Sequence, residues 1–228
     1  DTSLEKYSEI KKLMHTPGGA FGSCRHKLKD FNVNKREYRR LIDVFQAHNI
    51  GYFFYNGGGD SQDTTNKIAK YTLDAGFPVT CIGIPKTIDN DLPYTDNCPG
   101  FGSVAKYIAT STKEAALDVK SMSKSSTKVF ILEVMGRHAG WLAASAGLAK
   151  SKENSAPHII LLPEVPFNEK AFLKKVKEVV NKEGSCVSVV SEGTQYANGK
   201  FLADSGSVDS FGHKQLGGVA PRLAEIIN

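Results

Sequence analysis

Short apolar runs alternate along the chain with longer amphipathic stretches. The apolar runs cover residues 51–55, 79–84, 128–134, 158–162 and 186–190. They are nearly continuously apolar and do not alternate with polar residues, which predicts strands buried on both faces. Apolar side chains recur at helical spacing within residues 35–47, 64–75, 102–122, 138–149 and 168–180. The alternation of these two kinds of segment predicts an α/β fold built on parallel sheets.

Polar segments that contain glycine follow four of the predicted strands. Their sequences are NGGGDS at 56–61, PKTIDND at 85–91, MGR at 135–137 and SEG at 191–193. Ligands of open α/β sheets bind outside the carboxyl ends of the strands. The four segments are therefore expected to converge on one crevice.

Composition and charge exclude several classes of protein. The chain has 228 residues, 40% hydrophobic and 23% charged, which is typical of globular proteins and not of disordered or collagen-like ones. The net charge is only +5 and the basic residues are scattered, so we expect no nucleic-acid partner. No run approaches the roughly 18 apolar residues of a membrane span, which predicts a cytoplasmic protein without a membrane partner. The four cysteines are widely spaced, and we expect free thiols.

The glycine-rich segment at 56–61 joins a predicted strand to a predicted helix. Its three glycines would let an anion approach the backbone closely, beside the free N–H groups of a helix start. The same segment could be a tight turn in which Asp60 or Ser61 caps the helix. It matches neither of the common nucleotide-binding glycine motifs, so the residues alone do not identify the anion.

The segment at 85–91 carries two carboxylates two residues apart, Asp89 and Asp91, with Lys86 and Thr87 beside them. Such a loop can supply a general base, an acid facing a metal ion and a cation that neutralises phosphate. The alternative is a turn whose Asp and Asn side chains bond to their own backbone. The presence of lysine, threonine and two aspartates at a strand exit favours a functional loop.

Two arginines and one glutamate have both functional and structural interpretations. Arg25 ends a second glycine-rich loop, and Arg137 follows a strand. Either guanidinium could hold a phosphate group with two hydrogen bonds, or lie solvated at the surface. Glu192, at another strand exit, could accept hydrogen bonds from sugar hydroxyls or cap a turn.

In this order and spacing, GGGDS, PKTIDND, MGR and SEG resemble the motifs of the 6-phosphofructokinases. The resemblance covers most of the chain. It implies two α/β lobes, each a largely parallel sheet flanked by helices, with the active site in the cleft between them. The donor-phosphate lobe would be 1–100 and the sugar-phosphate lobe 101–228. The implied reaction is phosphoryl transfer to the 1-hydroxyl of fructose 6-phosphate, a step of glycolysis and gluconeogenesis, in a homo-oligomer.

The same resemblance assigns roles to individual residues. Asp89 corresponds to the proton acceptor, Asp91 to the acid near Mg²⁺, and Arg25 to a contact of the transferring phosphoryl group. The residues implied to bind the sugar phosphate are Thr87, Asp89, Met135, Gly136, Arg137 and Glu192. Those implied to bind the donor are Gly58, Gly59, Asp60, Ser61 and Lys86, of which Asp60 and Lys86 would also serve catalysis.

Two positions favour pyrophosphate as the donor. Asp60 and Lys86 stand where the ATP-dependent branch typically has glycine, and they match the pyrophosphate-dependent branch. An aspartate at position 60 would repel the α-phosphate of a nucleotide, and Lys86 could neutralise the leaving phosphate. The alternatives are an ATP-dependent 6-phosphofructokinase and a non-catalytic regulatory subunit, the latter because Gly59 replaces a common Asp or Asn that could bind the metal. The ends of the family pattern are missing, so we expect the 228-residue chain alone to be a partial, inactive and poorly folded enzyme.

Overall fold

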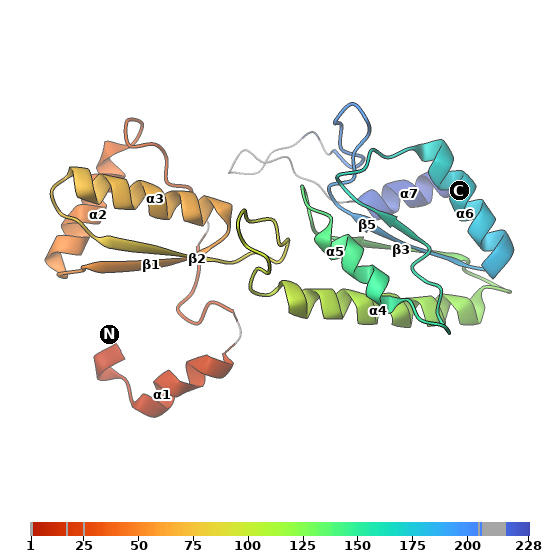
Figure 1. Ribbon diagram of the computed structural model, residues 1–228, viewed down its shortest axis with the longest axis horizontal. Helices are drawn as coiled ribbons and strands as arrows, with labels where there is room; N and C mark the ends of the chain where they lie inside the picture. Colours follow the sequence, from red (N-terminus) through yellow and green to blue (C-terminus); the bar gives the residue numbers. More distant parts are fainter. Residues whose placement is uncertain (1, 17, 25, 205, 207–217) are drawn as a thin grey trace.

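The computed structural model describes residues 2–16, 18–24, 26–204, 206 and 218–228. Its five strands form two separate parallel sheets (Figure 1). The first sheet pairs β1 (Tyr52–Gly57) with β2 (Thr80–Pro85). The second has the order β3-β5-β4, made of β3 (Val129–Val134), β4 (Ile159–Leu161) and β5 (Cys186–Ser191). The predicted α/β class with parallel sheets is confirmed.

The helices lie mainly between the strands in sequence. The longer ones are α2 (Lys35–Ala47), α3 (Gly59–Asp74), α4 (Phe101–Met122), α6 (Glu169–Glu183) and α7 (Val219–Ile227). The shorter ones are η1 (Thr2–Leu4), α1 (Tyr7–Lys12), η2 (Leu13–His15), α5 (Trp141–Ser145) and η3 (Ala146–Ala149). None of the described helices is long and apolar enough to cross a membrane.

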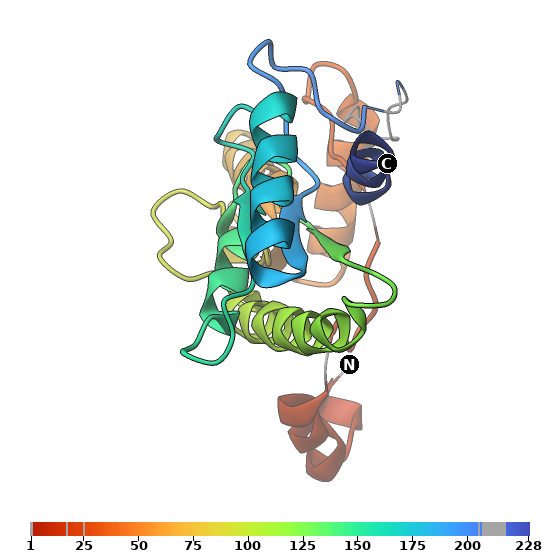
Figure 2. The ribbon, with the colours of Figure 1, turned by 90° about the vertical axis from the view of Figure 1, so that its right-hand side faces the viewer.

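The second sheet is covered on both faces. Alternate residues of a strand point to opposite faces, and on β5 the buried Val189 packs with α4 and α5 while Val190 packs with α6 and α7. Figure 2 shows α4 and α7 on different sides of these strands. The prediction of strands buried on both faces is correct here, because helices from two parts of the sequence cover the sheet.

The first sheet is covered on one face only, so the same prediction is wrong for β1 and β2. Helices α2 and α3 pack on one face, with Phe45, Ile68 and Phe53 in a common cluster. The opposite face exposes Tyr52 by 69%, Phe54 by 59%, Ile82 by 42% and Ile84 by 44%. Both described helices that follow or precede β1 lie on the same side, which leaves this apolar face open.

Two helices differ from their predicted lengths. Helix α3 begins at Gly59 and not at 64, with Gly58 as its N-cap, although its first turn contains the poor helix formers Gly59 and Asp60. The stretch predicted as one helix over 138–149 is a five-residue α-helix followed by a 3₁₀ turn. The division into lobes at residue 100 stays a prediction, although α4 does begin there, after the left-handed Gly100.

Candidate active site

The exits of β1 and β2 lie side by side and form the predicted donor loop. The backbone N–H of Lys86 donates to the carbonyl oxygen of Gly57 at 2.8 Å, which continues the ladder beyond the strands. Gly58 is the N-cap of α3, and the N–H of Ser61 donates to its carbonyl oxygen at 3.0 Å. A Cβ on Gly58 would lie 3.6 Å from the Lys86 carbonyl oxygen. The structure thus brings the glycine loop and Lys86 together.

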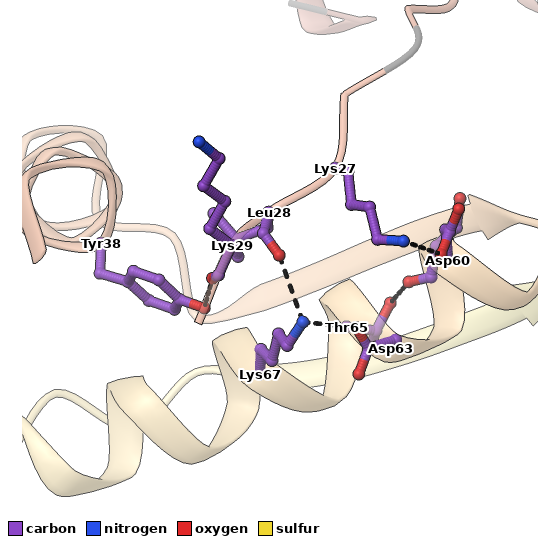
Figure 3. A network of polar contacts seen from close by, with 9 residues as sticks. Lys27, Leu28, Lys29, Tyr38, Asp60, Asp63, Thr65 and Lys67 are labelled. Carbon is purple, nitrogen blue, oxygen red and sulfur yellow. Dashed lines mark hydrogen bonds and ion pairs between the residues drawn. The ribbon is translucent and has the colours of Figure 1, made fainter. Parts of the chain in front are cut away.

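Asp60 lies in the first turn of α3 and does not cap it. The N-cap is Gly58, with no side-chain capping bond, so the alternative in which Asp60 or Ser61 caps the helix is wrong. The Asp60 Oδ1 atom is 3.5 Å from the Lys27 Nζ atom (Figure 3). Gly59, which precedes it, has nothing within 4 Å of a Cβ built there. This loop presents one carboxylate and one ammonium group beside a helix start.

The aspartate loop is held by its own polar groups. The N–H of Asp89 donates to the Thr87 Oγ1 atom at 3.2 Å. Buried Asn90 adopts the left-handed conformation, with φ of 58°. Its amide donates to the Asp96 carbonyl oxygen at 3.2 Å and accepts the N–H of Cys98 at 2.7 Å. The turn interpretation therefore holds for Thr87 and Asn90, whose side chains bond to the backbone of the loop. The hydrogen bonds that fix the turn do not involve the carboxylates of Asp89 and Asp91.

Asp89 carries the electrostatic signature of a general base. Its Oδ1 atom is buried and has no hydrogen-bond partner among the described residues. Burial raises its pKa first, the negative charges of Asp91 and Glu192 raise it further, and Arg137 and Lys86 oppose the rise. These groups follow the exits of β2, β3 and β5, so charges from three of the four predicted exits act on Asp89, while a single crevice shared by the four exits stays a prediction. A carboxylate with a raised pKa and an unpartnered oxygen is a better proton acceptor than an ordinary aspartate.

The two exits of the second sheet are bonded to each other. The Ser191 hydroxyl donates to the Gly136 carbonyl oxygen and accepts the N–H of Gly193 at 3.2 Å. The N–H of Glu192 donates to the Val134 carbonyl oxygen at 2.9 Å. Arg137 has a buried Nε atom without a hydrogen-bond partner among the described residues. The positive charge of Arg137 acts on Asp89, and its unpartnered Nε atom is a donor that a phosphate could use.

Three further residues shape the site, and the sequence analysis did not identify them. Ser191 and Glu164 are two of them. They fix the loop that follows Met135, a predicted site residue that is exposed by 55% at the end of β3. The Glu164 Oε1 atom accepts the N–H of Gly140 at 2.7 Å, just before α5. Asn90 is the third. Ser191 and Glu164 bond to residues 55 and 24 positions away, and only a contact map could have identified them.

The remaining predictions concern Arg25 and the metal ion. Arg25 lies outside the described residues. Asp91 is exposed, and no group of three or more His, Cys, Asp or Glu side chains among the described residues could hold a metal ion. One or two carboxylates do fit Mg²⁺, which keeps several waters and often relies on substrate phosphates. The four cysteines are free, as predicted.

A cavity in the first half of the chain does not coincide with this site. It has a volume of about 700 Å³ and is lined by residues of α2, β1 and α3 and by the segment before α2, including Arg36, Phe53 and Ile68. None of the predicted site residues lines it. Charge and burial, and not cavity size, locate the chemistry in the described part of the chain.

Comparisons with known proteins agree with the geometry. The family model described as Phosphofructokinase matches residues 2–227. Pyrophosphate--fructose 6-phosphate 1-phosphotransferases of Halomonas elongata and Methylococcus capsulatus are 60% and 56% identical over 227 residues, covering 100% of this chain and 54% of theirs. The crystal structure of a pyrophosphate-dependent phosphofructokinase from Marinobacter aquaeolei superposes with a TM-score of 0.82 at 58% identity, covering 100% of this chain and 51% of that one. The chain spans about half the length of the curated relatives it matches.

Proposed function

Because the chain belongs to the phosphofructokinase family, we propose that the protein transfers a phosphoryl group from pyrophosphate to the 1-hydroxyl of fructose 6-phosphate. The products are fructose 1,6-bisphosphate and phosphate. The observation that carries the proposal is the half-buried Asp89 carboxylate, whose Oδ1 atom has no hydrogen-bond partner among the described residues and whose pKa is raised by burial against the opposing charges of Arg137 and Lys86. The names of the most similar relatives support the same reaction.

Asp89 would act as the general base. As the sugar O1 atom bonds to phosphorus and the bridging P–O bond of pyrophosphate breaks, the O1 proton passes to the Asp89 carboxylate. The leaving phosphate carries away the bonding electron pair, and the proton later returns to solvent. Because donor and product bonds are similar in energy, the reaction should run in both directions.

Positive charges would position the phosphates and stabilise the transition state. Lys86 lies beside the donor loop and would neutralise the leaving phosphate, while Arg137 would hold a sugar-phosphate group. Arg25 is proposed to touch the transferring phosphoryl group, by resemblance alone. Mg²⁺, when bound near Asp91 and the phosphates, would neutralise further negative charge. Phosphoryl transfer of this kind depends on positioning and electrostatics.

The sugar-side contacts would come from the two bonded strand exits. Met135, Gly136 and Arg137 follow β3, and Glu192 follows β5. Thr87 would contact the substrate from the aspartate loop, although its hydroxyl already accepts the Asp89 N–H. The Glu192 carboxylate, held one residue from buried Ser191, is suited to accept hydrogen bonds from sugar hydroxyls.

The donor is the finer part of the proposal. Asp60 crowds the place where a nucleotide's α-phosphate would lie, and Lys86 suits a second phosphate. The ATP-dependent alternative keeps the same base and sugar contacts. The homo-oligomer stays a prediction carried by the family resemblance, and the cytoplasmic location and the lack of a nucleic-acid partner stay predictions from the apolar pattern and the scattered charge.

Initial rates on the full-length gene product test the reaction and the donor together. Fructose 6-phosphate is offered with Mg²⁺ and either pyrophosphate or ATP at equal concentration. Turnover with pyrophosphate alone supports the proposal, and turnover with ATP alone overturns the donor assignment. An Asp89→Asn variant is the matched control, since it keeps the size of the side chain and removes the base. No turnover with either donor, together with no binding of fructose 6-phosphate by calorimetry, would favour the non-catalytic alternative.

A further inference from the structure

The backbone that follows Lys27 is anchored to α2 and α3 by hydrogen bonds from other side chains. The segment that carries it passes over the first turns of α3 (Figure 3). The Lys67 Nζ atom donates to the Leu28 carbonyl oxygen at 3.2 Å, and the Tyr38 hydroxyl donates to the Lys29 carbonyl oxygen at 2.7 Å. Leu28 itself is buried, with 4% of its surface exposed. The backbone on the C-terminal side of Lys27 is therefore fixed against α3.

The Lys27 side chain extends from this anchored segment to Asp60. Its Nζ atom lies 3.5 Å from the Asp60 Oδ1 atom, and the two side chains are 45% and 46% exposed. An ion pair this exposed contributes little to stability. Its position at the donor loop, and not its energy, is therefore the feature that needs an explanation.

A carboxylate in the donor loop creates an electrostatic conflict. The start of α3 attracts anions through its free N–H groups and its dipole. Asp60 opposes that attraction, because its negative charge repels every phosphate donor, pyrophosphate included. Bulk and charge therefore act differently: bulk excludes only the larger donor, whereas charge weakens the binding of both.

We propose that Lys27 offsets the charge of Asp60 and so strengthens the binding of the phosphate donor at this loop. With the pair intact, Asp60 would exclude a nucleotide by its bulk while Lys27 offsets its repulsion of a diphosphate anion. This inference rests on the proposed function. It gives a role to a residue outside the glycine and aspartate loops. Lys27 would act through Asp60 and would not contact the sugar.

The test is the Michaelis constant for pyrophosphate in the full-length protein. Lys27→Gln should raise KM for pyrophosphate by about three- to tenfold, as expected for one screened charge near a multivalent anion. The kcat and the KM for fructose 6-phosphate should change by less than about twofold, and the effect should shrink at high salt. Lys27→Arg should restore the wild-type KM. Lys29→Gln is the matched control. It also removes one positive charge, but the Lys29 side chain points away from Asp60 (Figure 3).

A double variant separates charge compensation from a direct phosphate contact. In an Asp60→Asn background, which keeps the bulk and removes the charge, adding Lys27→Gln should no longer raise KM for pyrophosphate. The same increase in both backgrounds would overturn the inference, since Lys27 would then act without Asp60. An unchanged KM in Lys27→Gln, with active wild-type protein, would overturn it as well. Wild-type protein that does not use pyrophosphate at all would instead overturn the proposed function, and this inference with it.

Discussion

Replacing Gly193 with alanine should push apart the two strand exits that carry the sugar-side residues. A Cβ at Gly193 would overlap the Arg137 carbonyl oxygen and lie 2.6 Å from the Arg137 carbonyl carbon. It would also lie 2.8 Å from the Gly136 carbonyl oxygen, where real Cβ contacts stay beyond 3.0 Å. All three obstacles are backbone atoms, which cannot rotate aside as the end of a side chain can. The Arg137 backbone must therefore move.

The size of the effect follows from that overlap. Overpacking that forces a backbone shift costs about 1–3 kcal/mol, and a loss of about 2 kcal/mol lowers Tm by about 4–8 °C in a protein of this size. A displacement of about 1 Å at a positioning group can reduce the rate about 100-fold. We therefore expect Gly193→Ala to lower both Tm and kcat/KM for fructose 6-phosphate, while KM for pyrophosphate changes little.

Thermal melts and initial rates at varied fructose 6-phosphate measure this. Gly147→Ala is the control in the same half of the chain, because its Cβ would make an ordinary 3.8 Å contact with the Ile160 Cδ1 atom. A Gly193→Ala protein with wild-type Tm and wild-type kcat/KM for fructose 6-phosphate would refute the reasoning. It would mean that the exits of β3 and β5 can separate without consequence.

Three further outcomes follow from buried polar groups, and a fourth from the open sheet face. Burial raises the pKa of Asp89, so activity should fall on the acid side at a pH above the ordinary aspartate value of about 3.9, and Glu192→Gln should move that limb to lower pH in kcat/KM profiles. Burial lowers the pKa of His158, whose Nδ1 atom accepts the Val187 N–H. Because the unfolded chain then binds more protons, the free energy of unfolding in urea titrations should fall as pH drops below about 6.5. The fall should be smaller in a His158→Gln variant. Asn90→Ala leaves a buried N–H unpaired and should cost about 1–3 kcal/mol of unfolding free energy, whereas unchanged melts would exclude a role in holding the loop. The isolated 228-residue chain should bind a hydrophobic dye through its exposed β1–β2 face and show no turnover; a cooperative melt with measurable activity would contradict this.

Local pattern was enough to predict most of the strands and the loops that follow them. Strand β1 begins one residue after its predicted start. The agreement is close because the glycine before the apolar run limits where the strand can begin. Helix α6 begins next to Asn168, whose side chain accepts the Ala171 N–H as an N-cap should. Helix α3 was predicted too short, since Gly58 and Gly59, which suggested a loop, are its N-cap and its first residue, where helix propensity matters least.

Contacts between distant segments could not be predicted in this way. Tyr52 and Phe54 are exposed because α2 and α3 both pack on the opposite face of the first sheet. The composition of the strands does not determine on which face the helices pack. Ser191 appears in the sequence only as the residue before Glu192, and its bond to Gly136 spans 55 positions. Position after a strand is a local property, whereas the hydrogen bonds that fix the loops are long-range.

The charges around Asp89 suggest why this arrangement would respond to its own substrates. Burial already raises the pKa of this carboxylate, with Asp91 and Glu192 adding to the rise. Bound phosphate groups would bring more negative charge and raise it again. A base whose pKa rises as the anions arrive accepts a proton more readily at the moment of transfer. The charges of Arg137 and Lys86 oppose the rise by favouring the ionised carboxylate, and this balance needs charged groups from all three strand exits.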